Sequence, residues 1–578
     1  MSILIGAVSL SSTSQMLSAA LLRASQQHYQ LRCGHLDEQA LNPASLGSLH
    51  NNTHAQVGVL TLGLAASTQN CHAFRGRIIV SIIGHIENLN LILSKLDSVG
   101  YAANLSRAEE VVAALIDWHS RSHKDLLVAI REALAELQGY FSCCVYAQEL
   151  APSLICCSKG PQLYISQNSQ GNFVCSDRKI LKDQSSLFIT LDSDELAQIT
   201  PQQIFCFDYA GQVRHKDPTP HNAILGTTHH MLDDIFAQAM VAADLIELFL
   251  NNQLASVLNE LGQGHAFERI LLLASGSSHH AALSAQYWIE QIAALPCKVE
   301  YSSEYRDQQP LLEPNTLVIA ISQSGQTADT VAALRLAKAT GYQETLVISN
   351  QKNSPLAKLA KYEFLQYAGP ELSTASTKTY TSQLLCLYFI AIKLAEGRQR
   401  FNRAAIEELH CLPLALSETL QLNTQLKTWA QRLAPMQNLF VIGKHSQLPI
   451  AFEAAQKFKE VCYIHAEAYP SGELKHGPVA LIDHTIPVIA CLPWDVNADK
   501  MLANLHEVKS RKGDIYLLTD IALSSSEHFY CIQIPRKMPH LNPILYGVAF
   551  QLLSYLIAIS RGNDVDAPRN LSKAQAND

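Results

Sequence analysis

The sequence predicts an α/β protein in which a layered α+β domain precedes two doubly wound lobes built on parallel sheets. Three observations predict this order. Up to about Asp217, short apolar runs alternate with turns, as in a strand-rich layered domain. From Ile270 onward, continuous apolar runs alternate with amphipathic helical patterns, which favours parallel sheets covered on both faces. This second part also contains two similar segments in series, which indicates two lobes.

In the first domain, the apolar runs Ile78–Ile83 and Phe141–Tyr146 predict strands. The periodic segments Glu109–His119 and Lys124–Leu137 predict helices. The segment His215–Ala223 contains two prolines and no apolar run, so we expect a linker there.

In the second part, a helical stretch from about Met231 to Leu261 leads into the lobes. The first strands end in Gly, Ser or Asn turns, as in RILLLASGSS, NTLVIAISQSG and ETLVISN, and helical patterns such as Ala328–Thr340 follow them. The segment VIAISQSGQTADT from Val318 aligns with VIACLPWDVNADK from Val488, an offset of about 170 residues. The predicted domains are 1–217, a linker and helix over 218–262, lobes over 263–400 and 428–571, and a tail over 572–578.

The composition excludes several classes of partner. The chain has 43 Lys and Arg against 51 Asp and Glu, a net charge of −8 with both signs interspersed, so we expect no nucleic-acid or membrane partner. The apolar run Ile544–Ser560 contains Gln551 and Ser554 and predicts a buried helix. Fourteen cysteines without CxxC spacing, in a chain with no visible secretory signal, favour reduced thiols and a cytoplasmic location. We expect no metal and no cofactor.

A candidate phosphate site lies in the second part. The turn Ser322–Thr327 (SQSGQT) follows an apolar strand and precedes a helix, where ligands bind in such folds. Hydroxyl groups and unpaired N–H groups at a helix N-terminus suit a phosphate. The turn Ser275–Ser278 has the same position after the preceding strand, and Ser376–Thr377 adds hydroxyls. A lone turn of this kind is more often a helix cap than a ligand site. Three such turns in one lobe favour a ligand, and because they lack the Lys of a nucleotide P-loop, we expect a small phosphorylated metabolite rather than a nucleotide.

Four segments in order, SQSGQTADT, ASTKTYTSQ, KFKEVCYIHAEAYPSGELKHGP and DVDAPRNLSK, make the chain from Ile270 to Lys573 similar to one known family. It resembles the sugar-isomerase (SIS) half of glutamine–fructose-6-phosphate aminotransferase, also called glucosamine-6-phosphate synthase, an enzyme of amino sugar biosynthesis. The resemblance implies two SIS lobes, a homodimer and no cofactor. It also implies catalytic roles for four residues: Glu460, His476, Lys573 and Lys457. The substrate-binding residues that it implies are Ser275, Gly276, Ser277, Ser278, Ser322, Gln323, Ser324, Thr327, Thr374, Ser376 and Ser572.

In that resemblance, Glu460 moves a proton between C1 and C2, His476 assists ring opening, and Lys573 forms an imine with the open-chain ketose. Lys457 and Glu460 stand at i and i+3 of a helix and share one face, where the ammonium stabilises a carboxylate or an enolate oxygen. An imine requires that Lys573 be neutral. Without the resemblance, Lys457 and Glu460 would be interpreted as a solvated ion pair on a helix face. Lys573 would be interpreted as a frayed residue of the tail.

The chain departs from the family at several positions. Ser275-Gly276-Ser277-Ser278 stands where the family has Cys-Gly-Thr-Ser, Gln326 replaces Glu in SQSGET, and Thr374 replaces Val. These changes keep hydrogen-bonding groups but can alter sugar selectivity.

The N-terminal domain resembles the family's class II glutaminase (Ntn) domain, and Ile5-Gly6-Ala7-Val8 still matches. The family's nucleophilic Cys is Ser2 here. The glutamine-binding and oxyanion positions align with Gly63, Ile83 and Ala108, and the RGYDSAG motif is absent. The family's carboxylate-binding Arg is replaced by Gly63 and its amine-binding Asp by Ala108, so no charged group pairs with a zwitterionic amino acid. We therefore expect a glutaminase-like fold without glutaminase activity.

Three functions remain open from the sequence. The first is an enzyme acting on fructose 6-phosphate or glucosamine 6-phosphate, as an ammonia-dependent synthase, an isomerase or a deaminase. The second is a non-catalytic sugar-phosphate sensor or a regulatory partner of an intact synthase. The third is a glutamine-dependent synthase that uses Ser2. Retention of Lys457, Glu460, His476 and Lys573 favours the first.

Overall fold

The computed structural model describes residues 3–9, 48–52, 55–62, 72–74, 77–101, 105, 107–150, 152–168, 171–177, 187–193, 195–220, 229–254, 258 and 267–571. The chain divides into two compact units. The N-terminal unit comprises 1–228 with 246–248, and the C-terminal unit comprises 229–245 with 249–578. Each is described by itself below.

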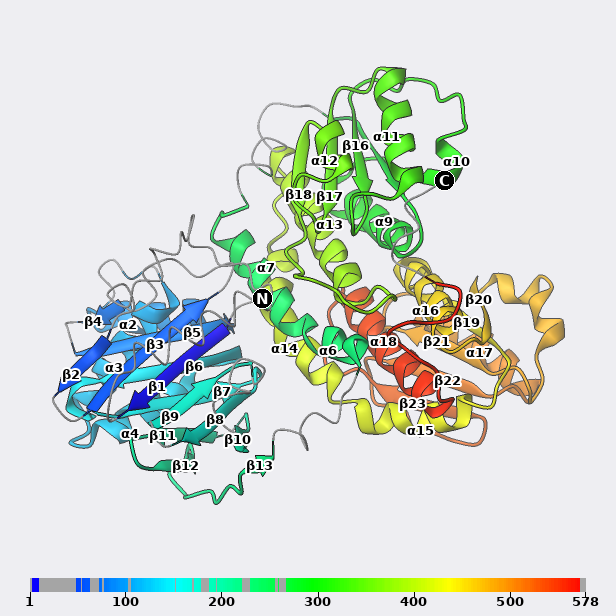
Figure 1. Ribbon diagram of the computed structural model, residues 1–578. Coiled ribbons are helices and arrows are strands. Elements are labelled where there is room, and N and C mark those ends of the chain that lie inside the picture. The colour runs from blue at the N-terminus through cyan, green and yellow to red at the C-terminus, as the bar shows by residue number, and fades with distance from the viewer. Residues whose placement is uncertain are drawn as a thin grey trace. The chain divides into compact units, whose positions relative to one another are not determined.

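The N-terminal unit contains two antiparallel sheets in the residues that are described (Figure 1). The first has the order β13 (Thr219–Pro220), β10 (Leu187–Leu191), β8 (Leu163–Asn168), β9 (Gly171–Cys175), β1 (Ile3–Ser9), β3 (Ala55–Leu62), β2 (Ser48–Asn52). The second has the order β12 (Ile204–Asp208), β11 (Glu195–Ile199), β7 (Leu154–Lys159), β6 (Gly139–Ala147), β5 (Ile78–Ile86), β4 (His72–Phe74). The helices are α2 (Leu89–Ser98), α3 (Ala108–Ser120) and α4 (Leu126–Glu136).

Helices α3 and α4 pack on β5 and β6 of the second sheet, whose other face meets the first sheet. Because β6 is covered on both faces, all nine of its residues are buried, as its near-continuous apolar sequence requires. The side chain of Asp125 accepts a hydrogen bond from Leu127 N and so fixes the start of α4. The strand and helix predictions in this region agree with β5, β6, α3 and α4.

The predicted linker His215–Ala223 is partly wrong. Its residues Thr219 and Pro220 form the short strand β13, which pairs with Leu187 and Phe188 at the edge of the first sheet. A proline is tolerated at such an edge because the missing N–H would face away from the sheet.

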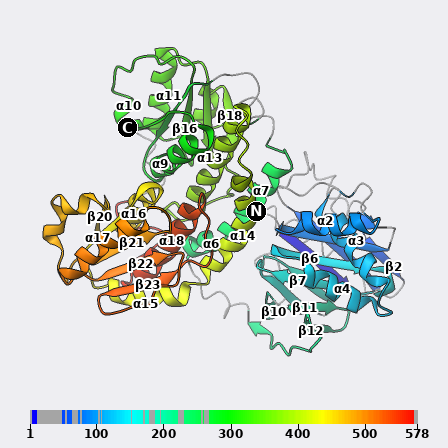
Figure 2. The same cartoon turned by 180° about the vertical axis from the view of Figure 1, so that it is seen from behind.

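The C-terminal unit begins with α6 (His230–Phe236) and α7 (Gln238–Leu250), where the sequence predicted one helical stretch, and continues into two lobes (Figure 2). Lobe 1 has a parallel sheet in the order β15 (Cys297–Tyr301), β14 (Arg269–Ala274), β16 (Thr316–Ile321), β17 (Thr345–Ser349), β18 (Tyr362–Leu365). Its helices are α9 (Ser277–Trp288), α10 (Ser302–Tyr305), α11 (Ala328–Thr340), α12 (Pro355–Leu359) and α13 (Lys378–Gly397).

Lobe 2 repeats this topology. Its parallel sheet has the order β20 (His465–Pro470), β19 (Asn438–Gly443), β21 (Val488–Leu492), β22 (Ile515–Thr519), β23 (Phe529–Gln533). Its helices are α14 (Arg403–Leu420), α15 (Asn423–Leu433), α16 (Leu448–Glu460), α17 (Ala498–Ser510) and α18 (Asn542–Ser560). The predicted fold class is therefore confirmed: a layered α+β region followed by two doubly wound parallel-sheet lobes.

In both lobes the central strands are buried on both faces, because helices cover each side of the sheet. Helix α18 is the one helix among the described residues that is long and apolar enough to cross a membrane, but 83% of its apolar window is buried inside the protein. It is therefore a core helix, as the sequence predicted for Ile544–Ser560.

Candidate active site

The strand order of lobe 1 creates a crevice between β14 and β16. From β14 the chain crosses to β15 on one side, and β16 to β18 extend the sheet on the other side. The connections that follow β14 and β16 therefore diverge at the carboxyl ends of these strands. In doubly wound sheets this point is where ligands bind.

The turn after β16 is built from its own hydroxyl groups. Ser322 Oγ lies 2.8 Å from Thr327 Oγ1 and accepts a hydrogen bond from Gly325 N at 3.1 Å. Ser324 Oγ accepts from Gln326 N at 3.2 Å. Gly325 has φ +64, and a Cβ there would lie 2.2 Å from Ser354 Oγ, so only glycine fits. The turn is held in one shape at the N-terminus of α11.

The turn after β14 approaches the same crevice. Gly276, with φ +56, precedes α9, whose first residues are Ser277 and Ser278. Ser275 Oγ is buried and has no hydrogen-bond partner in the part of the chain that the structure describes. A buried hydroxyl of this kind is costly without a partner, so it marks a position that a ligand can satisfy.

A third segment carries Thr374 and Ser376. Ser376 Oγ lies 2.6 Å from Thr379 Oγ1, and Thr379 Oγ1 donates to Glu371 at 2.6 Å. The backbone N and the Oγ1 of Thr374 donate to the carbonyl of Asp566, at 3.1 and 2.9 Å. The Asp566 carboxylate also accepts from the backbone N of His230 and Met231, both at 2.8 Å. The C-terminal segment thus fixes this side of the site.

Helix α16 of lobe 2 brings a buried charge cluster against α9 of lobe 1. Lys457 Nζ lies 2.7 Å from Glu460 Oε2, 3.2 Å from Glu453 Oε1 and 3.3 Å from Ser277 Oγ. Ser277 Oγ donates to Glu453 at 3.0 Å, and His280 Nδ1 lies 2.7 Å from the other oxygen of Glu453. Spacing of three and four residues places the three α16 side chains on one face.

The opposite charges of this cluster stabilise one another in their ionised forms. Burial alone would lower the pKa of Lys457, but the carboxylates of Glu453 and Glu460 raise it above the usual value, so it stays an ammonium. Burial alone would raise the pKa of Glu453, but Lys457 and His280 lower it, so it stays a carboxylate. The side chains of Lys457 and Glu453 are 1% and 3% exposed and that of Glu460 is 20% exposed, so Glu460 is the most exposed of the three α16 side chains.

The structure joins some of the predicted catalytic residues and separates others. Lys457 and Glu460 form the cluster beside Ser277. His476 follows the short helix Glu473–Lys475 and is exposed, and within the described residues no hydrogen bond or ion pair joins its side chain to α16. Ser572 and Lys573 lie outside the described residues.

Sequence reasoning missed Glu453 and His280. Glu453 could have been found, because it stands four residues before Lys457 on the same face of a predicted helix. His280 could not, because its contact with Glu453 joins two lobes whose packing no local pattern reveals.

In the N-terminal unit, two of the aligned glutaminase positions are described. Ile83, which aligns in sequence with the family's oxyanion donor, is an apolar residue within β5 and 3% exposed. Gly84 beside it has φ +92, and a Cβ there would lie 2.2 Å from Tyr140 O. Ala108 begins α3 and offers no carboxylate. Ser2 and Gly63 lie outside the described residues.

A parallel sheet of order 2-1-3-4-5, present twice, with a hydroxyl-lined crevice in the first copy, is typical of a tandem sugar-isomerase protein. The SIS domain family matches residues 266–393 and 432–561. The chain belongs to the glutamine–fructose-6-phosphate aminotransferase (isomerizing) family. The protein of that name from Legionella pneumophila strain Paris is 37% identical over 524 residues, which cover 88% of this chain and 86% of that protein. The one from Idiomarina loihiensis is 34% identical over 523 residues, which cover 87% of this chain and 86% of that protein.

The same likeness extends to solved structures. The C-terminal domain of glucosamine-fructose-6-phosphate aminotransferase from Francisella tularensis has a TM-score of 0.56 and 34% identity, and covers 59% of this chain and 99% of that domain. A putative phosphosugar isomerase from Silicibacter pomeroyi, 24% identical with a TM-score of 0.52, shares the fold. The predicted family is thus confirmed.

Proposed function

We propose that this protein is an enzyme that binds fructose 6-phosphate and converts it to glucosamine 6-phosphate, with ammonia rather than glutamine as the nitrogen donor. The observation that carries the proposal is the Lys457–Glu460 pair held against Ser277, beside a hydroxyl-lined crevice. A sensor requires a phosphate site but no buried pair of this kind, since it moves no proton. Membership of an aminotransferase family supports the same choice.

In this proposal the 6-phosphate lies against the turns after β14 and β16, at the N-termini of α9 and α11. Hydroxyl groups and the partial positive charge of both helices favour an anion there. Ser275 Oγ, buried without a partner in the described part of the chain, donates to the ligand. The remaining predicted contacts, Gln323, Ser324, Thr374, Ser376 and Ser572 among them, stay predictions.

The chemistry follows from the charges. Glu460 carries the proton between C1 and C2, because it is the carboxylate with access to the crevice. Lys457 does not act as a base, because Glu453 and Glu460 hold it as an ammonium; it stabilises the developing enolate oxygen. Ring opening by His476 and imine formation by Lys573 remain proposals carried by the family resemblance.

Glutamine is excluded in this proposal by what replaces its contacts. Buried Ile83 cannot donate a hydrogen bond to an oxyanion, and Ala108 cannot hold an ammonium group. Loss of an oxyanion donor alone costs roughly a hundredfold or more in rate. The N-terminal unit then keeps a glutaminase-like fold without the reaction.

The decisive experiment is an assay of the full chain with fructose 6-phosphate plus glutamine, then with an ammonium salt. Glucosamine 6-phosphate and glucose 6-phosphate are followed separately. We expect the amino sugar with ammonium only. Amino sugar or glutamate release with glutamine that Ser2→Ala abolishes would contradict the choice of donor. Glucose 6-phosphate alone would indicate an isomerase, and release of ammonia from glucosamine 6-phosphate without the forward reaction would indicate a deaminase. Binding without turnover would indicate a sensor.

The homodimer and the cytoplasmic location belong to the same proposal. The dimer is implied by the family resemblance. The location is supported by the cysteines, since those in the described residues are free and ten of them are buried. Analytical ultracentrifugation of the purified full chain tests the dimer, and fractionation of cells that express it tests the location.

A further inference from the structure

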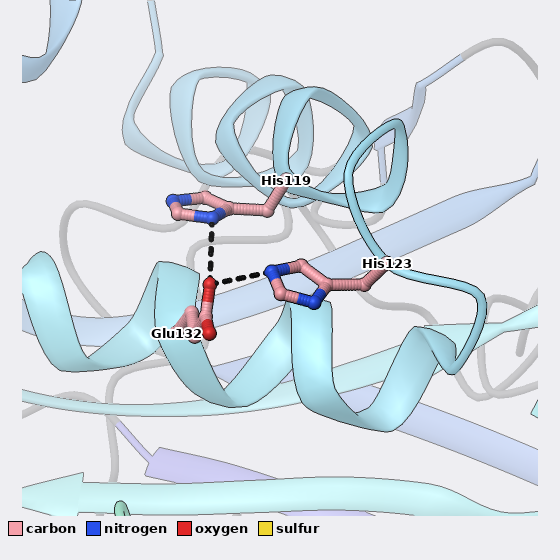
Figure 3. A group of neighbouring side chains, drawn as sticks. All are labelled: His119, His123 and Glu132. Atoms are coloured by element: carbon pink, nitrogen blue, oxygen red, sulfur yellow. Dashed lines mark hydrogen bonds and ion pairs between the residues drawn. The ribbon is translucent and has the colours of Figure 1, made fainter.

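We propose a zinc site in the N-terminal unit, formed by His119, His123 and Glu132. His119 lies in the last turn of α3, His123 follows in the connection to α4, and Glu132 lies on α4 (Figure 3). Their ligand atoms all lie within 4.8 Å of one another. The expectation of no metal rested on cysteine spacing, which says nothing about a histidine–carboxylate set.

The three donors converge on one point. One oxygen of Glu132 lies 3.3 Å from His119 Nδ1 and 2.8 Å from His123 Nε2, and Figure 3 shows both rings turned toward it. Two ligands about 2.0–2.1 Å from a tetrahedral zinc ion are separated by a little over 3 Å, so small side-chain rotations suffice. Two imidazoles and one carboxylate favour zinc over calcium or magnesium, which prefer oxygen ligands alone.

A second set of contacts orients the deepest ligand. The other nitrogen of His119, Nε2, lies 2.8 Å from Glu136 Oε1. Lys95 Nζ donates to both oxygens of Glu136, at 2.8 and 2.6 Å, and so fixes this carboxylate. When Nε2 donates to Glu136, the lone pair of Nδ1 faces Glu132 and His123. Metal-binding histidines are usually held by a carboxylate in this way.

The site is open on one side. The side chain of His119 is 11% exposed, whereas those of His123 and Glu132 are 29% and 44% exposed. His123 also lines a cavity of about 360 Å³, whose other charged lining residues carry both signs: Asp117 and Glu149 as well as Arg77, Arg121 and Lys124. An ion can therefore enter from solvent, and water completes its coordination. Bound zinc would tie the end of α3 to α4.

The test uses the full chain, freed of metal with a chelator and titrated with zinc chloride by calorimetry. Glu132→Gln and His123→Gln are the main variants, since both side chains are partly exposed and their replacement spares the core. We expect each to weaken the affinity of this site by roughly 100-fold or more, and Glu136→Gln to weaken it roughly 10- to 100-fold. The matched control is His528→Gln in the other unit. It removes a histidine whose Nδ1 lies 2.6 Å from the Asp514 carboxylate, and it should leave the zinc affinity unchanged.

Thermal unfolding and cobalt substitution give independent measurements. Zinc should raise the unfolding temperature of the wild type and of His528→Gln, but not of Glu132→Gln or His123→Gln. Cobalt should give visible absorption without the thiolate charge-transfer band that cysteine ligands add. Equal zinc affinity in the wild type and in both main variants, or a thiolate band that neither variant alters, would overturn the site. Unchanged affinity in Glu136→Gln would overturn the orienting role of Glu136.

Discussion

The two lobes of the C-terminal unit share one strand order but differ at the turns that follow equivalent strands. In lobe 1, Ser322–Thr327 after β16 presents hydroxyls. In lobe 2, the aligned segment after β21 runs through Pro493, Trp494 and Asp495, and the N–H of Trp494 donates to the carboxylate of Asp520 at 2.7 Å. Lys537 Nζ also donates to the carbonyl of Trp494 at 2.7 Å, so this turn carries both charge signs, and it has no Ser or Thr hydroxyl over Pro493–Asn497. The two turns have the same place in the fold but carry different side chains, so we expect only the lobe 1 turn to bind a phosphate.

Lobe 2 contributes helix α16 rather than a turn with hydroxyl groups. The charged face of α16 reaches α9 of lobe 1, where Ser277 connects the hydroxyl turns with Lys457 and Glu453. The comparison therefore suggests a division of labour in which lobe 1 binds the phosphate and lobe 2 supplies the proton chemistry.

The largest test of this division is Glu460→Gln. The substitution keeps the size of the side chain but removes the base, so we expect turnover to fall by about two to four orders of magnitude. Sugar-phosphate affinity, measured by calorimetry, should change little, because in the proposed division lobe 1 holds the phosphate. A comparable loss of affinity would mean that lobe 2 also binds the ground state.

The next test removes two hydroxyls from lobe 1. Ser324→Ala with Thr327→Ala should weaken sugar-phosphate binding by about two orders of magnitude or more, because each hydrogen bond to a charged group contributes about 1.5 kcal/mol or more. The aligned change in lobe 2, Trp494→Ala with Asn497→Ala, is the control and should leave the affinity unchanged. Equal losses from both pairs would contradict the comparison.

The charged cluster between the lobes predicts a pH dependence of stability. The pKa of Glu453 is lowered by folding, so its contribution is present above about pH 4.3 and is lost as the pH falls through its folded pKa. The pKa of Lys457 is raised, so its contribution is present below about pH 10.4 and is lost as the pH rises through its folded pKa. Glu453→Gln breaks a buried pair and should destabilise the unit at neutral pH, by up to about 3–5 kcal/mol.

Thermal unfolding of the wild type and Glu453→Gln between about pH 3 and pH 7 measures this effect. The difference in unfolding temperature should narrow as the pH falls, since the wild type then loses the same charge. A constant difference would show that the loss comes from packing rather than from ionisation.

The smallest expected effect concerns the shape of the lobe 1 turn. Gly325→Ala combines φ +64 with a contact of 2.2 Å to Ser354, and should lower stability by about 1–3 kcal/mol while weakening sugar-phosphate binding. Gly369→Ala is a matched control, because φ is +69 but nothing lies within 4 Å of the added Cβ. If both variants lose the same stability, as measured by urea unfolding, the contact with Ser354 contributes nothing.

The parts of the fold that depend on local pattern were predictable from the sequence. The apolar strands, the repeated lobes and the Ser322–Thr327 turn all follow from periodicity and turn residues, which act over short distances. The strand β13 was missed because its Thr219–Pro220 pairing depends on a neighbour far away in the sequence. The contacts of Ser277 and His280 with Glu453 were missed for the same reason, since they join segments more than a hundred residues apart.

Asp566 gives the C-terminal segment a role in the order of assembly. One residue accepts hydrogen bonds from Thr374 in lobe 1 and from the first turn of α6, with its carbonyl and its carboxylate respectively. A ribosome makes Thr374 and α6 long before it makes Asp566. Both segments must therefore wait until residue 566 has been synthesised before they gain this common partner. A nascent chain that stops short of Asp566 would lack this anchor of Thr374, although the neighbouring Ser373 would still contact Asp234.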